Sequence, residues 1–174
     1  MPGNLRRTPS TFDSSECSDV VLLVENNEVH ASRAILALHS PVFKSMFFGQ
    51  FDEHEKDIIP LPGIAHNEFI DFLRVIYPER KKVTEESVEY LLKLGDLYDC
   101  ATVLRKCVKF LGKTTNVAVS LKLLYADKYR LPELREICFK QMTSPSAFRE
   151  LSASPHFSQY SPELLKAIIS KIPT

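Results

Sequence analysis

The fold is decided by residues 18–36, which read SDVVLLVENNEVHASRAIL. The run 20–24 is continuously apolar and rich in β-branched residues, and Asn26 and Asn27 follow it shortly afterwards. An apolar run, an Asn-rich turn and a second extended piece predict a β-hairpin. Because polar residues do not alternate with apolar ones in the first strand, we expect that strand to be buried on both faces. Ser32 then predicts the start of a short helix, since serine is a favoured N-cap residue.

The remainder of the chain is predicted to be mainly helical. Ser40-Pro41 indicates a second helix start, because serine suits the N-cap and proline the first helical position. Residues 57–61 predict a third strand, which Pro60 places at a sheet edge or a bulge. Apolar residues at helical spacing, with the caps and breaks around them, predict further helices over 69–76, 84–97, 100–111, 116–125, 131–142, about 148–151 and 162–172. This order, β-β-α-α-β-α followed only by helices, predicts an α+β fold.

Length and composition exclude several classes of protein. The 174 residues fit one domain of ordinary size, or a small domain with an appendage. Lys plus Arg and Asp plus Glu both number 22, which argues against a dedicated binder of nucleic acid or acidic membranes. No apolar run approaches the ~20 residues that span a bilayer. Four cysteines without a secretory signal predict reduced thiols and a cytoplasmic or nuclear location.

The motifs of common catalytic and metal sites are not found in the sequence. Cys17, Cys100, Cys107 and Cys138 form no C-x-x-C pair, and the histidines form no tight pairs with them. There is no G-x-S-x-G turn and no phosphate-binding glycine loop. We therefore predict no enzyme, no catalytic residue, no metal, no cofactor and no small-molecule substrate.

Several polar and aromatic side chains have two possible roles. Asp19 and His30 flank the predicted hairpin, and we expect each to bond backbone groups rather than to carry chemistry. Phe48 and Phe51 lie in or beside a mostly acidic loop. A cluster of exposed aromatic residues often marks a docking site, whereas the alternative is that Phe51 folds back onto the core. The composition of the loop favours neither alternative.

Four blocks of sequence together resemble a BTB/POZ domain. They are SDVVL (18–22), VHASRAILA (29–37), SPVFKSMF (40–47) and FLRVIY (72–77), and the resemblance extends from about Ser18 to Phe110. It is nearest in kind to the BTB half of MATH-BTB proteins, and it implies a small mixed sheet flanked by helical hairpins. On this basis we expect a flexible lead-in (1–15), a BTB/POZ domain (16–112) and a helical extension (113–174). The predicted hairpin 116–142 is similar to the extension that follows the BTB core in cullin-3 adaptors.

The resemblance also implies a function. BTB domains dimerise, and many bind cullin-3 as substrate adaptors of ubiquitin ligases. Cullin-binding members carry an apolar-x-Glu motif after the Met-Phe helix, and Phe51, Asp52 and Glu53 match it. Pairing with itself or with another BTB protein is expected to use the helix that contains Ile35 and Leu38.

Two other functions compete with that of an adaptor. The alternative is an oligomerisation scaffold or transcriptional cofactor that does not bind cullin. A channel tetramerisation domain is disfavoured, because no membrane-spanning segment is expected. No MATH domain, Kelch repeat or zinc finger is expected either, so the usual substrate-binding arm has no counterpart in these 174 residues.

Overall fold

The computed structural model describes residues 12, 17–49, 57–79, 81–142 and 144–171. The chain forms two compact units. The first comprises residues 1–81 and 97–101, and the second comprises residues 82–96 and 102–174. Within the described residues, the first unit holds the β-sheet, and every regular element of the second is helical. The domain boundary predicted at residue 112 stays a prediction, because compact packing and sequence families divide chains by different criteria.

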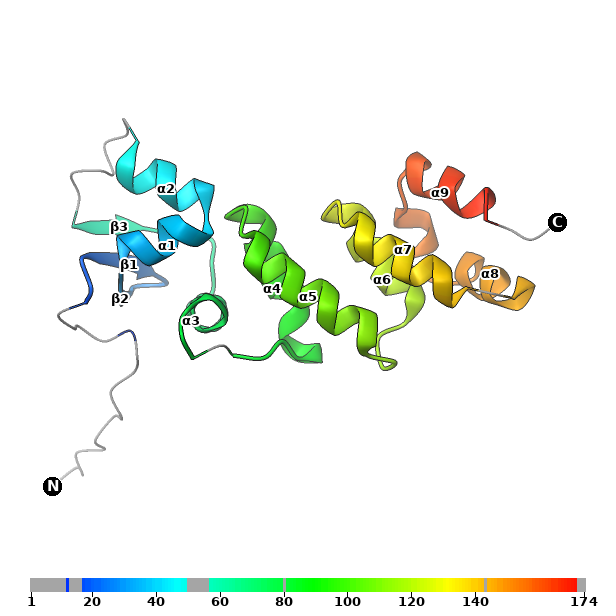
Figure 1. Cartoon of the computed structure of the whole chain (residues 1–174), viewed down its shortest axis with the longest axis horizontal. Coiled ribbons are helices and arrows are strands. Elements are labelled where there is room, and N and C mark those ends of the chain that lie inside the picture. Colours follow the sequence, from blue (N-terminus) through cyan, green and yellow to red (C-terminus); the bar gives the residue numbers. More distant parts are fainter. Residues whose placement is uncertain (1–11, 13–16, 50–56, 80, 143, 172–174) are drawn as a thin grey trace, which may run out of the picture. The chain divides into compact units, whose positions relative to one another are not determined.

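The first unit is built around a three-stranded mixed sheet (Figure 1). Its central strand, β1 (Val20–Val24), pairs antiparallel with β2 (Asn27–Ala31) and parallel with β3 (Ile58–Pro60). The predicted hairpin is therefore confirmed. So is the edge position of the third strand, where the missing N–H of Pro60 is tolerated.

The hairpin turn is a two-residue loop formed by Glu25 and Asn26. Their φ angles of 47° and 61° lie in the left-handed region, which matches the twist of the flanking strands. The Asn27 side-chain amide donates to the Glu25 carbonyl at 2.8 Å and helps to hold the loop. One face of β1 is fully buried and the other only half-buried, so the expectation of burial on both faces is confirmed only in part.

Three helices complete the first unit: α1 (Arg33–His39), α2 (Pro41–Phe48) and α3 (His66–Ile76). Aromatic residues from α2, α3 and the residue 97–101 segment fill its core. Phe43 stacks on Tyr98 with ring centroids 4.3 Å apart, and the rings of Phe69 and Phe72 lie 6.1 and 5.6 Å from Tyr98. These four rings are all buried and pack against one another in the core of this unit.

The starts of α1 and α2 are capped differently. Ser40 caps α2 as predicted, since its hydroxyl accepts a hydrogen bond from the Phe43 N–H at 3.0 Å. Ser32 occupies the N-cap position of α1 as predicted, but its side chain makes no capping bond. The carboxylate of Asp19 accepts from the Arg33 N–H at 2.7 Å instead. A charged acceptor forms the stronger bond at the positive end of a helix.

Asp19 thus bonds a backbone group, as expected. His30 has a different neighbour: among the described residues, its imidazole lies 3.9 Å from the Glu28 carboxylate.

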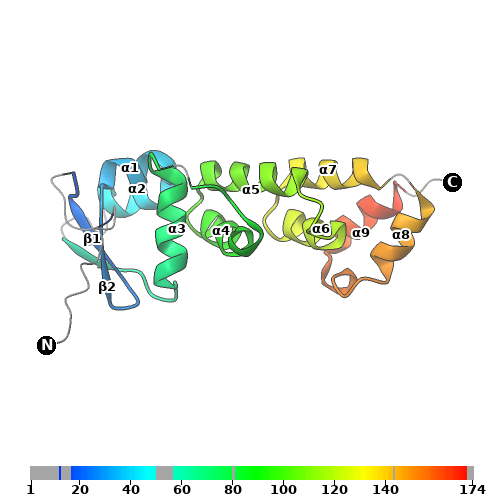
Figure 2. The same cartoon turned by 90° about the horizontal axis from the view of Figure 1, so that it is seen from below.

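The second unit contains six α-helices within the described residues (Figure 2). They are α4 (Glu85–Leu97), α5 (Ala101–Lys113), α6 (Val119–Lys128), α7 (Pro132–Gln141), α8 (Pro145–Ser152) and α9 (Pro162–Ile169). A short 3-10 helix, η2 (Phe157–Gln159), precedes α9. The junction of α4 and α5, residues 97–101, belongs to the first unit. Helices α6 and α7 pair as the predicted hairpin.

Helix α6 begins later than the predicted range 116–125. The N-cap position is Ala118, which provides no side-chain bond to the first turn. The Asn116 amide instead donates to the Glu85 carboxylate, at the start of α4, at 2.6 Å. Asn116 therefore lies before the helix, and α6 begins at Val119, three residues after the predicted start.

Candidate protein-interaction surface

The predicted cullin-binding residues Phe51, Asp52 and Glu53 lie outside the described residues. The structure does describe the helix that leads to them. Helix α2 ends at Phe48, and Gly49 follows at its C-cap. The described part of the candidate surface is therefore α2 and the neighbouring helix α1.

The start of α2 is fixed by a buried polar contact. The Ser40 hydroxyl caps the helix and also donates to the Tyr98 carbonyl at 2.5 Å. Burial raises the pKa of the Tyr98 phenol well above its ordinary value, so the ring stays neutral against Phe43. These contacts hold the helix axis in a defined direction.

The end of α2 presents one aromatic ring to the core and the next to solvent. Phe47 is buried, stacks with Phe43 at 5.6 Å, and has the Arg33 guanidinium 5.5 Å from its ring centre. Phe48 is 57% exposed and lies edge-on to Phe47 at 6.5 Å. Successive residues of a helix point about 100° apart, so a well-packed Phe47 directs Phe48 outward. Phe48 is thus an exposed aromatic side chain on a firmly held helix.

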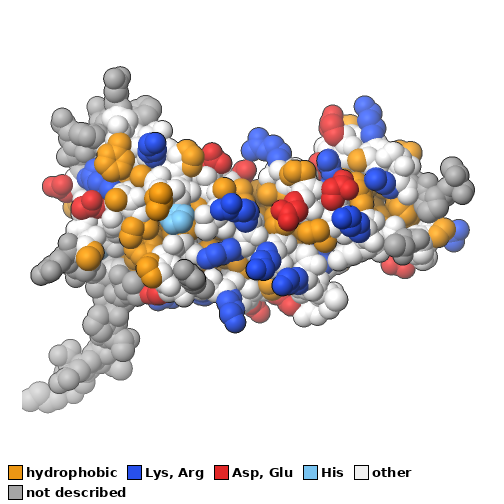
Figure 3. Space-filling view, viewed as in Figure 1, with side chains coloured by type: hydrophobic (Ala, Val, Ile, Leu, Met, Phe, Trp, Pro, Cys, Tyr) orange, Lys and Arg blue, Asp and Glu red, His pale blue; other side chains and the backbone are white. Residues whose placement is uncertain are grey.

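The predicted dimer-contact residues lie on α1. Leu38 is 79% exposed, whereas Ile35, three residues earlier on the same face, is half-buried. Figure 3 shows hydrophobic side chains at the surface of the first unit, to which α1 and α2 belong. Leu38 is therefore available to a partner, and Ile35 only in part.

Val42 is a surface residue of α2 that the spacing of apolar residues does not reveal. It shares the helical spacing of Phe43, Met46 and Phe47, but it is exposed while Phe43 is completely buried. In a helix of only eight residues, the spacing of apolar residues does not show where the buried face ends. The sequence therefore does not predict that Val42 is exposed.

The described residues contain no group of three or more His, Cys, Asp or Glu side chains that could hold a metal ion. Cys100, Cys107 and Cys138 are buried and Cys17 is exposed, and none of the four is part of a disulfide. No helix in the described ranges has the length and apolar character needed to cross a membrane.

Comparison with known families identifies the class of protein. The model of the BTB/POZ domain matches residues 10–115, more than half of the chain. The chain therefore belongs to the BTB/POZ family, a class of protein-interaction modules rather than enzymes. The predicted resemblance and the α+β BTB fold are both confirmed.

The most similar curated relatives include two nematode proteins. BTB and MATH domain-containing protein 38 of Caenorhabditis elegans is 34% identical over 88% of this chain and 40% of its own length. BTB and MATH domain-containing protein 36 of the same organism is also 34% identical, over 88% of this chain and 48% of its own length. The chain thus spans less than half the length of these relatives.

More distant similarities are found in human proteins. Kelch-like protein 24 is 28% identical over 80% of this chain and 24% of its own length. Among solved structures, the BTB domain of human gigaxonin matches with a TM-score of 0.47 and 20% identity, covering 54% of this chain and 77% of that one.

Proposed function

We propose that this protein binds cullin-3 and acts as an adaptor or regulator of a cullin-3 RING ubiquitin ligase. The observation that carries the proposal is the exposed ring of Phe48 at the end of α2, directly before the predicted cullin-binding loop. Aromatic side chains on a rigid support are frequent hot spots of protein interfaces. Membership of the BTB/POZ family and the predicted motif 51–53 support the same surface.

Each residue of the surface has a distinct role in this proposal. Phe51 enters an apolar pocket of the cullin, and Phe48 widens the apolar contact beside it. Glu53 accepts a hydrogen bond from the partner or orients the loop. Asp52, between them, adds negative charge to the rim, where charge changes association rate more than affinity.

Self-association is the second part of the proposal. Leu38 and Ile35 form the contact with a second copy or with another BTB protein, in the cytoplasm or the nucleus. The exposure of Leu38 also favours the alternative function, a BTB scaffold or transcriptional cofactor that oligomerises without cullin.

Calorimetry with the N-terminal part of cullin-3 tests the proposal. We expect saturable binding by the wild-type chain and at least a tenfold loss in Phe51→Ala and in Glu53→Lys, since hot-spot truncation costs about 1.4 kcal/mol or more. Ile169→Ala, which shortens an exposed apolar residue on α9, is the control and should bind normally. Absence of binding by a folded wild-type chain would favour the scaffold. Undiminished binding by Phe51→Ala would remove the loop from the interface.

A further inference from the structure

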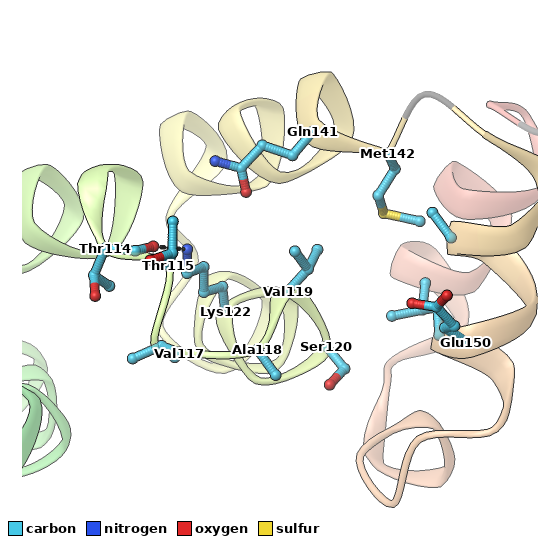
Figure 4. A pocket seen from close by; sticks show the side chains of 12 residues that line it. Thr114, Thr115, Val117, Ala118, Val119, Ser120, Lys122, Gln141, Met142 and Glu150 are labelled. Carbon is cyan, nitrogen blue, oxygen red and sulfur yellow. Dashed lines mark hydrogen bonds between the residues drawn. The ribbon is translucent and has the colours of Figure 1, made fainter.

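A cavity of about 540 Å³ lies within the second unit (Figure 4). It is bounded by the turn after α5, the start of α6, the end of α7 and helix α8. This volume falls in the range of roughly 300–1,000 Å³ that is typical of ligand sites. The lining combines apolar side chains with a few polar ones, which is the usual composition of a binding pocket.

Lys122 is the unusual member of the lining. Its side chain is only 2% exposed, and its ammonium donates to the Thr114 carbonyl at 2.6 Å. An ammonium has three N–H donors, and a buried charge is normally matched by an opposite charge. No carboxylate among the described residues forms an ion pair with Lys122, and burial lowers its pKa. The positive charge at this end of the cavity is thus not neutralised by a described acidic group.

The start of α6 adds a second source of positive potential. Ala118, Val119 and Ser120 line the cavity, and no side chain caps the first turn of α6. The free N–H groups of that turn are the positive end of the helix dipole. Lys122 lies in the following turn of the same helix, where a cation is unfavourable unless an anion is close by. The helix start and the buried lysine both line this cavity, and both favour an anion in it.

The rest of the cavity limits what the anion can be. Glu150 lies on the α8 side, away from the Lys122 ammonium (Figure 4), and it would repel a ligand with two negative charges. Met142 and Leu151 offer apolar contact, and Gln141 and Glu150 offer acceptors for N–H groups. A singly charged carboxylate joined to apolar and amide groups fits these requirements, and a phosphate does not.

We propose that this cavity binds an acidic side chain of a partner peptide, with its carboxylate between the Lys122 ammonium and the first turn of α6. A neighbouring apolar side chain of the peptide packs on Met142 and Leu151, and its backbone N–H groups face Glu150. The site lies wholly in the second unit and does not depend on cullin binding or on Phe51.

Two matched peptides test the role of the charge without altering the protein. The probes are acetyl-Leu-Glu-Leu-amide and acetyl-Leu-Gln-Leu-amide, titrated into the full chain at low ionic strength and followed by NMR. We expect saturable binding of the Glu peptide, at least tenfold tighter than that of the Gln peptide. Equal affinities for the two peptides, or no binding of the Glu peptide at millimolar concentration, would overturn the proposal.

Variants of the protein then locate the site. Lys122→Met keeps the apolar stem and removes the charge, so it should weaken binding of the Glu peptide at least tenfold. Lys140→Met, at an exposed position of α7, is the matched control and should bind normally. Butyrate tests whether the cavity prefers a peptide to a free small carboxylate. Weaker binding of butyrate than of the Glu peptide supports a peptide ligand, whereas equal affinity for the two would overturn the peptide assignment.

The unfolding temperature distinguishes a binding lysine from a structural one. Without ligand, Lys122→Met should unfold at the same temperature as the wild type or at a higher one. It removes a buried charge that no acidic group neutralises, which offsets the lost bond to the Thr114 carbonyl. A lysine whose only role is to bond the Thr114 carbonyl would instead stabilise the fold. A lowered unfolding temperature, or undiminished peptide binding by this variant, would contradict the proposal.

Discussion

The hydroxyl of Ser40 donates a hydrogen bond to the backbone carbonyl of Tyr98, 58 positions away in the sequence. The same oxygen accepts a bond from the Phe43 N–H at 3.0 Å, and Ser40 is fully buried. One side chain thus caps α2 and joins it to the junction of α4 and α5. The contact holds the helix whose far end presents Phe48.

Removal of this hydroxyl is expected to destabilise the first unit. Ser40→Ala should lower the free energy of unfolding by about 1–3 kcal/mol, because it removes an N-cap and leaves a buried carbonyl without a donor. Urea denaturation measures the change. Ser32→Ala is the matched control at the start of α1, where the serine side chain caps nothing, and it should cost less than about 0.5 kcal/mol. Equal losses in the two variants would contradict this account.

Sequence reasoning succeeded where the determining contacts are local. The Ser40-Pro41 helix start, the hairpin and the edge position of Pro60 all depend on residues a few positions apart. It did not predict the polar contacts at the starts of α1 and α6. Asp19 accepts from the first N–H of α1, and Glu85 accepts from the Asn116 amide before α6. Both carboxylates are distant in sequence from the groups they bond, so no local pattern indicates these contacts.

The candidate sites were predictable to different degrees. The sequence blocks that resemble a BTB/POZ domain predicted the α1–α2 surface. They did not predict which of the adjacent residues Phe47 and Phe48 is exposed, because that depends on the packing of Phe47 against Phe43. The buried Lys122 was missed, because lysine is almost never fully buried. Its burial could be suspected in the sequence from its position alone, since Lys122 lies three and four residues before the buried Tyr125 and Ala126, on the same helix face.

The attachment of α9 in the second unit gives another prediction. The Asp127 carboxylate accepts bonds from both the N–H and the hydroxyl of Ser161, each at 2.7 Å, and Ser161 caps α9. Asp127→Ala should therefore lower the free energy of unfolding by about 1–3 kcal/mol and speed proteolytic cleavage near α9. Asp96→Ala is the control, since Asp96 pairs with the exposed Arg130 and such pairs contribute about 0–1 kcal/mol. A larger loss in the control than in Asp127→Ala would refute the assignment.

The buried thiol of Cys138 predicts a loss of stability at alkaline pH. Burial raises its pKa from 9.0 to about 11, while the nearby Lys122 cation acts in the opposite direction. Between these values the folded chain holds a proton that the unfolded chain releases, so the stabilisation present below pH 9 is lost as the pH rises toward 11. The full loss is on the order of 2–3 kcal/mol.

Urea unfolding at pH 8 and pH 10.5 measures this effect. Cys138→Ala should show a smaller fall in stability between the two pH values than the wild type does. It should not abolish the fall, because burial also raises the pKa of Tyr125 and Tyr160 to about 12. Cys17→Ala, at an exposed thiol, should leave the pH dependence unchanged. An identical slope in the wild type and Cys138→Ala would rule out the buried thiol as its source.

The exposed Leu38 makes self-association testable. Full burial of a leucine side chain contributes about 1.5–3 kcal/mol, and a two-fold symmetric interface contains the residue twice. Leu38→Asp should therefore raise the dissociation constant of the dimer at least a hundredfold, measured by light scattering over a range of concentrations. Ile169→Asp, at a position that is 67% exposed on α9, is the matched control and should dimerise normally. A monomeric wild type, or a Leu38→Asp variant that dimerises as well as the control, would show that this face of α1 does not form the contact.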